Sequence, residues 1–235
     1  MKKTLTMLFS LLAFIACRHD KDVPGPGTMA EDEDWYILRA PQNREIQAVY
    51  GDIDGTLLIT DRFRIYYTGD KGKTWTQADY QNNIGLAGFV ARNDTLFVLD
   101  TETKSSADPG NRYAIRPYYF SVNGGAHWEA LPARLTLDEV KVPLNYAYSG
   151  NGNRFSIDRV FHPDGSVEDL GVKGESGRQI GLPQLHVLNT VHFDAKSRLY
   201  VAGSAPLCDQ KGYVKLCDEK DASGTLYISK KAVYY

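Results

Sequence analysis

One eight-residue pattern occurs twice in this chain and constrains the fold more than any other feature. The first copy runs from Thr68 to Trp75, and the second runs from Ser121 to Trp128. Each copy begins with a hydroxyl residue, continues through Asp or Asn and then Gly, and ends with Trp. The shared positions are Thr68, Asp70, Gly72 and Trp75, and Ser121, Asn123, Gly125 and Trp128. A short pattern that returns after about fifty residues predicts stacked, equivalent units.

The chemistry of the pattern predicts a hairpin turn that holds its own backbone. Asp70 and Asn123 can accept hydrogen bonds from nearby backbone N–H groups, and Gly72 and Gly125 can take turn conformations that other residues resist. The Trp that follows is expected to pack back against the sheet. These side chains are therefore expected to have a structural role. The alternative is two ordinary turns that share Gly and Trp.

A run of aromatic residues precedes each copy, at Tyr66-Tyr67 and at Tyr118-Tyr119-Phe120. With these runs, the pattern resembles the Asp-box, or BNR, repeat of sialidase-like β-propellers. The resemblance implies an all-β fold in which this turn joins the third and fourth strands of a blade. It also implies that the turns lie on the face opposite the usual binding face.

Short runs rich in Val, Ile, Tyr and Phe recur throughout the chain and predict about four units of four strands each. The units begin near Gln47, Ala87, Leu144 and Val187. This spacing is typical of propeller blades. The fourth unit lacks a last strand, whereas residues 34–41 resemble one, so we expect the N-terminal strand to close the last blade. The alternative is a truncated gene that leaves an open arc of blades.

The N-terminus predicts export and lipidation. A basic start precedes an apolar run from Leu5 to Ala16, which is too short to span a bilayer and ends at Cys17. This resembles a bacterial lipobox, with residues 1–16 as the signal peptide and Cys17 as the lipidated residue, although Phe14 replaces the usual Leu. The alternative is an ordinary secretory signal in which the Cys is incidental.

Residues 17–34 are acidic and contain Pro and Gly, so we expect a flexible tether ahead of a propeller domain over residues 35–235. Asp and Lys soon after Cys17 resemble the surface-export signals of Bacteroidetes lipoproteins, which implies an outer-membrane anchor that faces the medium. A formal net charge of −2 without a basic run argues against a nucleic-acid partner. We expect membrane contact only through the lipid on Cys17.

The resemblance also implies that the connections between second and third strands, and those from one blade to the next, line the binding face. Two of them are predicted to be short, at Asp61-Arg62 and Asp158-Arg159, and two long, at 101–113 and 204–223. In the third unit, residues 163–166 are then expected to join the third and fourth strands. Cys208 and Cys217 are expected to form a disulfide in the last long connection.

Three side chains are candidates for binding: Arg62, Arg159 and Tyr213. Arg62 and Arg159 would face the binding side, where a guanidinium group can hold a carboxylate. The alternative, which we favour, is that each arginine pairs with the preceding acidic residue, Asp61 or Asp158. Tyr213 lies between the two cysteines of the last long connection.

Catalysis is not expected. Sialidases use three converging arginines, a Tyr nucleophile with a Glu partner, an Asp acid, and a Phe/Tyr-Arg-Ile-Pro motif. Phe63-Arg64-Ile65-Tyr66 matches only part of that motif and lies directly before the repeat. No metal-ligand spacing or cofactor motif is present, so neither a metal nor a cofactor is expected. We expect a surface lipoprotein that binds a glycan or a protein. The alternatives are a sialidase-like glycoside hydrolase and a structural module of an envelope assembly.

Overall fold

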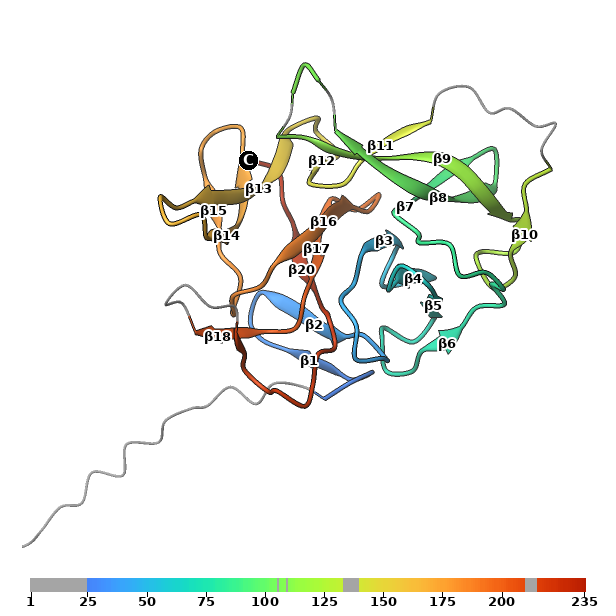
Figure 1. Ribbon diagram of the computed structural model, residues 1–235, viewed down its shortest axis with the longest axis horizontal. Coiled ribbons are helices and arrows are strands. Elements are labelled where there is room, and N and C mark those ends of the chain that lie inside the picture. The colour runs from blue at the N-terminus through green and yellow to red at the C-terminus, as the bar shows by residue number, and fades with distance from the viewer. Residues whose placement is uncertain (1–24, 105, 109, 133–139, 210–214) are drawn as a thin grey trace, which may run out of the picture.

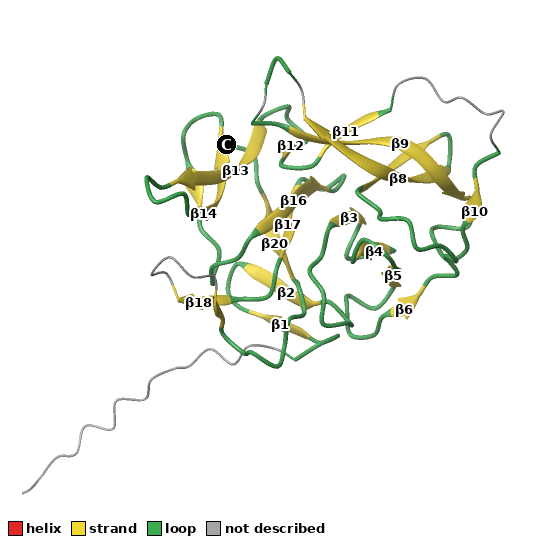
Figure 2. Cartoon of the chain, in the orientation of Figure 1, coloured by secondary structure: helices red, strands yellow, loops and turns green. Residues whose placement is uncertain are grey.

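Strands are the regular elements of the part of the chain that the computed structural model describes, which comprises residues 25–104, 106–108, 110–132, 140–209 and 215–235. Figure 2 shows strands joined by loops and turns over these ranges. In the same ranges, no helix is long and apolar enough to cross a membrane. The prediction of an all-β chain is confirmed.

Four sheets lie around a common centre as the blades of a propeller (Figure 1). Blade 1 consists of β3 (Ala48–Gly51), β4 (Leu57–Thr60), β5 (Ile65–Thr68) and β6 (Thr76–Gln77). Blade 2 consists of β7 (Gly88–Arg92), β8 (Thr95–Lys104) and β9 (Arg112–Ser121), with β10 (Glu129–Ala130) and β11 (Lys141–Pro143) on the outer edge of β9.

Blade 3 consists of β12 (Tyr146–Tyr148), β13 (Arg154–Phe161), β14 (Val167–Gly174) and β15 (Gln179–Ile180). Blade 4 consists of β16 (Leu188–Phe193), β17 (Arg198–Gly203), β20 (Thr225–Ala232), β2 (Trp35–Arg39) and β1 (Met29–Glu31). The inner strand β16 contacts both β12 and β3, and β3 contacts β7. The four-bladed arrangement predicted from the repeated strand pattern is confirmed.

The N-terminal strand completes the last blade, as predicted. β2 pairs antiparallel with β20, so that Ile37 lies opposite Tyr227 and Trp35 lies opposite Ser229. Buried side chains from blades 4 and 1 then form one apolar cluster, which includes Leu38 and Leu57. The chain ends are thereby tied into a closed ring of blades rather than an open arc.

The predicted tether boundary is wrong for residues 29–34. β1 pairs with β2, with Ala30 opposite Ile37. The acidic run that follows forms the turn between them, because a carboxylate oxygen of Asp32 accepts hydrogen bonds from the backbone N–H groups of Asp34 and Trp35 at 2.9 and 2.8 Å. A short polar edge strand such as β1 has the same composition as a linker, so the sequence alone does not distinguish the two. The pairing of β1 with β2 identifies it as a strand. Residues 17–24 lie outside the described ranges.

The two copies of the repeated pattern form turns with the same internal hydrogen bonds. The backbone N–H of Gly72 donates to Thr68 Oγ1, and that of Gly125 donates to Ser121 Oγ, both at 3.0 Å. Asp70 accepts from the backbone N–H of Thr74 at 2.9 Å, and Asn123 accepts from that of His127 at 3.1 Å. Each turn joins the third and fourth strands of its blade, β5 to β6 or β9 to β10.

The glycine of each turn packs against the preceding blade. A Cβ atom on Gly72 would overlap the side chain of Leu38 in blade 4, and one on Gly125 would overlap that of Leu58 in blade 1. Both glycines also have positive φ angles, +80° and +92°, which favour glycine. Each turn therefore packs against a core side chain of the preceding blade.

Blade 3 departs from the predicted strand boundaries. The predicted turn at Asp158-Arg159 is a β-bulge inside one long strand, β13, where the register shifts between Ile157 and Arg159. A bulge leaves a residue unpaired without ending the strand. Residues 163–166 therefore join the second and third strands of blade 3, not the third and fourth, as Phe161 pairs with Val167.

The two long connections are also more regular than predicted. Residues 101–104 and 112–115 continue β8 and β9 as a paired hairpin, with Lys104 opposite Arg112. The polar residues 101–104 have the composition of a loop, which is why the sequence predicted one there. In the last connection, β18 (Leu207–Asp209) pairs with β19 (Lys215–Leu216), and the predicted disulfide between Cys208 and Cys217 is confirmed, with Cα atoms 4.7 Å apart.

The docking of the second turn predicts unequal effects of alanine at two adjacent glycines. Gly125→Ala adds a Cβ atom that overlaps Leu58, which is only 2% exposed, and it also strains a positive φ. We expect the free energy of unfolding to fall by about 2–4 kcal/mol in urea denaturation. Gly124→Ala is the matched control, because φ is +72° but no atom lies within 4 Å of the added Cβ. It should cost only about 1 kcal/mol, and equal losses for the two variants would contradict the docking.

Candidate functional site

The strand connections define two faces of the ring. The turn between β3 and β4 lies beside the first repeated turn, because Lys71 Nζ is 3.2 Å from a carboxylate oxygen of Asp54. We call this side the turn face. The connections between second and third strands lie at the other ends of the antiparallel strands, and they include Asp61–Arg64 and residues 163–166. We call that side the hairpin face.

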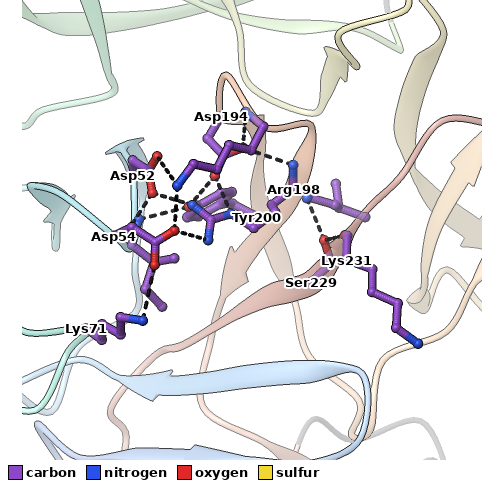
Figure 3. Close-up of polar contacts among 11 residues, drawn as sticks. Asp52, Asp54, Lys71, Asp194, Arg198, Tyr200, Ser229 and Lys231 are labelled. Carbon is purple, nitrogen blue, oxygen red and sulfur yellow. Dashed lines mark hydrogen bonds and ion pairs between the residues drawn. The ribbon is translucent and has the colours of Figure 1, made fainter.

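A cluster of six charged side chains lies on the turn face where blade 4 meets blade 1 (Figure 3). We call it the seam cluster, and its members are Asp52, Asp54, Lys71, Asp194, Lys196 and Arg198. Arg198 donates to Asp194 Oδ2 at 2.6 Å, to Asp54 Oδ2 at 2.7 Å, and also to Asp52. Lys196 Nζ donates to the same oxygen of Asp54 at 2.7 Å.

The seam cluster is internally satisfied. The hydroxyl of Tyr200 donates to Asp194 Oδ2 at 2.9 Å and accepts from the backbone N–H of Ile53 at 3.0 Å. Burial raises the pKa of Tyr200 well above its ordinary value, so the hydroxyl keeps its proton. Every carboxylate in the cluster has a cationic partner, and the contacts of Arg198 and Lys196 with Asp52 and Asp54 join blade 4 to blade 1.

A second group of charged side chains lines a cleft of about 340 Å³ between blades 2 and 3. The lining includes four cationic residues, Lys104, Arg112, Arg154 and Arg159. Lys104 and Arg112 lie opposite each other at the end of the β8–β9 hairpin, and the other two come from β13. We call this site the cationic cleft.

Two of the three arginines in the cationic cleft are already paired. Arg159 makes a bidentate ion pair with Asp169 at 2.6 and 2.7 Å, which raises the pKa of the arginine. Arg112 Nε lies 2.9 Å from a carboxylate oxygen of Glu102. Both arginines also donate to backbone carbonyls of blade 4, Arg159 to Leu188 and Arg112 to Asn189, each at 3.1 Å. They therefore hold blades 2 and 3 to blade 4 as well as lining the cleft.

Arg154 differs from its neighbours because no carboxylate within the described residues pairs with it. Its Nη2 donates to Asn111 Oδ1 at 2.7 Å, and its guanidinium lies over the ring of Tyr146, 3.9 Å from the ring centre. Its Nε is buried and makes no hydrogen bond within the described part of the chain. The Nε of Arg112 is likewise buried without a hydrogen bond there, so what distinguishes Arg154 is that it has no carboxylate partner among the described residues.

The binding residues that the sequence predicted lie in different parts of the structure. Arg159 lines the cationic cleft, but it pairs with Asp169 and not with Asp158. Arg62 does not line the cleft, and it donates to Gln47 Oε1 at 3.0 Å rather than pairing with Asp61. Asp61 instead accepts from the backbone N–H groups of residues 63 and 64. Both favoured pairings were wrong, because Arg159 pairs with Asp169 on the neighbouring strand β14 and Arg62 bonds to Gln47, which directly precedes β3. Tyr213 and Cys17 lie outside the described residues.

The structure adds Lys104, Arg112, Arg154 and Phe161 to the candidates. The ring of Phe161 is 75% exposed at the tip of the β13–β14 hairpin, opposite Val167. In the sequence, each of these residues resembles the end of an ordinary strand. They come together only because blade 2 packs against blade 3. Among the residues that the structure describes, no group of three or more His, Cys, Asp or Glu side chains is placed to hold a metal ion.

Comparisons with known proteins identify no family. No family model matches the chain, and no curated protein matches it. Among solved structures, a streptogramin B lyase aligns with 11% identity and a TM-score of 0.27 over 77% of this chain. A domain named as the extracellular part of a B. thetaiotaomicron one-component system aligns with 9% identity and a TM-score of 0.29 over 77% of this chain. YCF48 from Cyanidioschyzon merolae aligns with 13% identity and a TM-score of 0.27 over 80% of this chain and 77% of its own.

The chain spans 58% of the length of the lyase and 32% of the length of the extracellular domain. All three TM-scores are low, so neither the fold nor the function of this chain is inferred from these structures. The propeller assignment depends on the strand pairing of the four blades. Because one fold can support many functions, the function depends on the residues of the site.

The seam cluster predicts acid-sensitive stability. Hydrogen bonds from Lys196, Lys71 and Arg198 hold the pKa of Asp54 well below its ordinary value of 3.8. A carboxylate with a lower pKa in the folded state stabilises the fold above the unfolded pKa, and this contribution is lost as the pH falls through the folded pKa. We expect Asp54→Asn to lower the free energy of unfolding by roughly 1 kcal/mol at neutral pH, and the difference from wild type to shrink below about pH 4.

Urea denaturation at several pH values measures this difference, and Asp164→Asn is its control. The pKa of Asp164 is also lowered, but by Ser166 in the same turn, at 2.6 and 2.9 Å, so its loss breaks no contact between blades. A penalty for Asp54→Asn that stays constant down to about pH 2 would contradict the assignment.

Proposed function

We propose that this protein is a surface lipoprotein whose Asp-box propeller binds a glycan in the cationic cleft without catalysing a reaction. The observation that carries the proposal is the cleft itself, because it combines unpaired cationic groups with an exposed aromatic ring on a rigid scaffold. Binding groups on the hairpins of a rigid ring are held in place before a ligand arrives.

The chemistry of the lining suits a sugar. Phe161 is exposed, and Ser156 and Asp158 line the same cleft. An aromatic ring can cover the apolar face of a sugar, while hydroxyl and carboxylate groups exchange hydrogen bonds with its hydroxyls. A few placed polar groups beside an apolar surface are typical of small-ligand sites. A protein partner is the competing class of ligand.

The repeated turns support membership of the Asp-box repeat. Both join the third and fourth strands of a blade, and both use the hydroxyl, the Asp or Asn side chain and the glycine in the same way. The resemblance places these turns away from the binding face. The cationic cleft is lined by the β8–β9 hairpin, which lies on the hairpin face, and by β13, which runs from its turn-face end at Arg154 to the hairpin-face tip at Phe161.

Binding is favoured over sialidase-like hydrolysis by the state of Tyr146, the tyrosine on which Arg154 stacks. The hydroxyl of Tyr146 donates to the hydroxyl of Tyr113 at 3.3 Å, and no carboxylate among the described residues accepts its proton. Burial, together with this hydrogen bond, raises the pKa of Tyr146 to about 12. A tyrosine nucleophile needs an adjacent base or a lowered pKa. Release of a fluorogenic sialoside that Arg62→Ala abolishes would instead support the hydrolase alternative.

The N-terminus supports the proposed location. Residues 1–16 have the pattern of a signal peptide, and Cys17 follows as in a lipobox. We expect the full-length chain, expressed in a bacterium with an outer membrane, to incorporate labelled palmitate and to be cleaved by protease added to intact cells. Cys17→Ala should abolish the label and release the protein from the membrane fraction. A Cys17→Ala protein that remains labelled and membrane-bound would contradict lipidation at this residue.

Glycan-array binding by residues 18–235, which hold the whole ring, tests the proposed function. We expect signals that Phe161→Ala weakens about fivefold, because the lost contact is worth ~1 kcal/mol. Val122→Ala is the matched control, since Val122 is 71% exposed in the second repeated turn on the opposite face, against 75% for Phe161. Equal affinities for the Phe161→Ala and wild-type proteins, or an array without any signal, would count against the proposal and favour a protein partner.

A further inference from the structure

We propose that a second cleft, on the outer part of blade 1, binds an acidic segment of a protein partner through Arg44 and Arg64. This cleft has a volume of about 510 Å³, and we call it the rim cleft. Its lining includes Arg44, Asp61, Phe63, Arg64, Tyr66 and Gln77. It shares no lining residue with the cationic cleft, so the inference does not depend on the proposed glycan site.

The rim cleft lies away from the centre of the ring. β3 is the inner strand of blade 1, since it contacts β16 and β7, and β6 is the strand farthest from it in the sheet. Gln77 of β6 lines the cleft, and Figure 1 shows β6 at the outer edge of the ring. The hairpin over residues 61–64 completes the cleft at the hairpin-face end of the blade. A partner can therefore reach it from the side of the ring.

The charges of the rim cleft favour an acidic ligand. Arg44 and Arg64 make no ion pair within the described residues. Asp61, the carboxylate of the lining, is 6% exposed and accepts hydrogen bonds from the backbone N–H groups of Phe63 and Arg64 at 2.9 and 2.8 Å. Burial raises the pKa of Tyr66 to about 12, so its hydroxyl adds no negative charge. Carboxylates of a ligand would therefore complete the charge balance of the two arginines.

The two guanidinium groups are positioned before a ligand arrives. The guanidinium of Arg44 lies 5.5 Å from the ring centre of Phe63, and Arg64 Nη1 donates to the backbone carbonyl of Phe63 at 2.8 Å. The backbone beneath them is also held, because Thr60 Oγ1 donates to the carbonyl of Arg64 and the N–H of Gly224 donates to that of Arg44, both at 2.8 Å. Groups that are already held lose less freedom on binding.

Apolar side chains beside the arginines favour a protein over a sugar. Phe63 in the lining is 37% exposed, and Ile84, which directly follows the lining residue Asn83, is 36% exposed. An aliphatic side chain such as Ile84 offers a sugar no hydrogen bond, whereas it packs well against an apolar residue of a peptide. Arginine beside an aromatic ring is typical of protein interfaces. The matching segment carries carboxylates next to apolar side chains.

Peptide binding at low ionic strength tests the inference. The probes are a fluorescein-labelled peptide in which Glu and Leu alternate, the same peptide with Gln in place of Glu, and the same peptide with Ser in place of Leu. By fluorescence anisotropy, we expect the residue 18–235 protein to bind the Glu–Leu peptide at least about tenfold more tightly than the Gln–Leu peptide. Replacement of Leu by Ser should weaken binding about fivefold, because apolar contact is lost.

Variants of the two arginines locate the contact. Arg44→Gln and Arg64→Gln should each weaken binding of the Glu–Leu peptide about fivefold and leave binding of the Gln–Leu peptide unchanged. Arg178→Gln is the matched control, because Arg178 is also exposed and stacks on an aromatic ring, 3.6 Å from the ring centre of Tyr235, but lines neither cleft. Circular dichroism and thermal melting show whether each variant is folded.

The outcomes separate this inference from the proposed glycan binding. Equal affinity for the Glu–Leu and Gln–Leu peptides, or no binding of either, would overturn the inference. Folded Arg44→Gln and Arg64→Gln proteins that bind the Glu–Leu peptide like wild type would also overturn it. Oligogalacturonate that displaces the peptide and loses affinity in the same variants would overturn the assignment to a protein partner. The cationic cleft is tested separately, and Phe161→Ala should leave peptide binding unchanged.

Discussion

The pairing of β2 with β20 is the contact on which the rest of the structure depends. Without it, blade 4 would expose the edge of β20, and the ring would be open between its ends. The same strand brings Leu38 to the site where Gly72 of the first repeated turn packs. Its last residue, Arg39, is 1% exposed and donates to Asp221 at 2.8 Å and to Thr225 at 2.6 Å. The N-terminal strand β2 thus completes the sheet of blade 4, packs against the first repeated turn, and bonds to the end of the connection that contains the disulfide.

The turn face and the seam between blades 2 and 3 differ in how their polar groups are paired. On the turn face, the side chains of Asp70 and Asn123 bond to their own turns, and the charges of the seam cluster pair with one another. Polar contacts are prominent where blade 2 meets blade 3. Asn145 accepts a hydrogen bond from the backbone N–H of Arg112 at 2.7 Å, and Arg154 of β13 donates to Asn111 at 2.7 Å. The cationic cleft lies beside these contacts.

Local patterns in the sequence predicted the scaffold because turn chemistry and strand alternation depend on near neighbours. The similarity of residues 34–41 to a fourth strand was enough to predict ring closure. The bulge at Asp158 could not be predicted in this way, since a polar pair inside a strand looks like a turn. The partners of Arg159 and Arg62 were missed for a related reason, because strand pairing sets them and proximity in sequence does not. Arg112 and Arg154 form a site only after two blades pack together.

We propose that the turn face is scaffold and that a ligand binds between blades 2 and 3. Hydrogen–deuterium exchange with and without a saturating glycan distinguishes the two faces, because a bound ligand slows local opening of the backbone that it contacts. We expect slower exchange in residues 154–161 of β13 and in residues 101–104 and 112–115 of the β8–β9 hairpin, with the turns at 68–75 and 121–128 unchanged. Slower exchange confined to those two turns would contradict it.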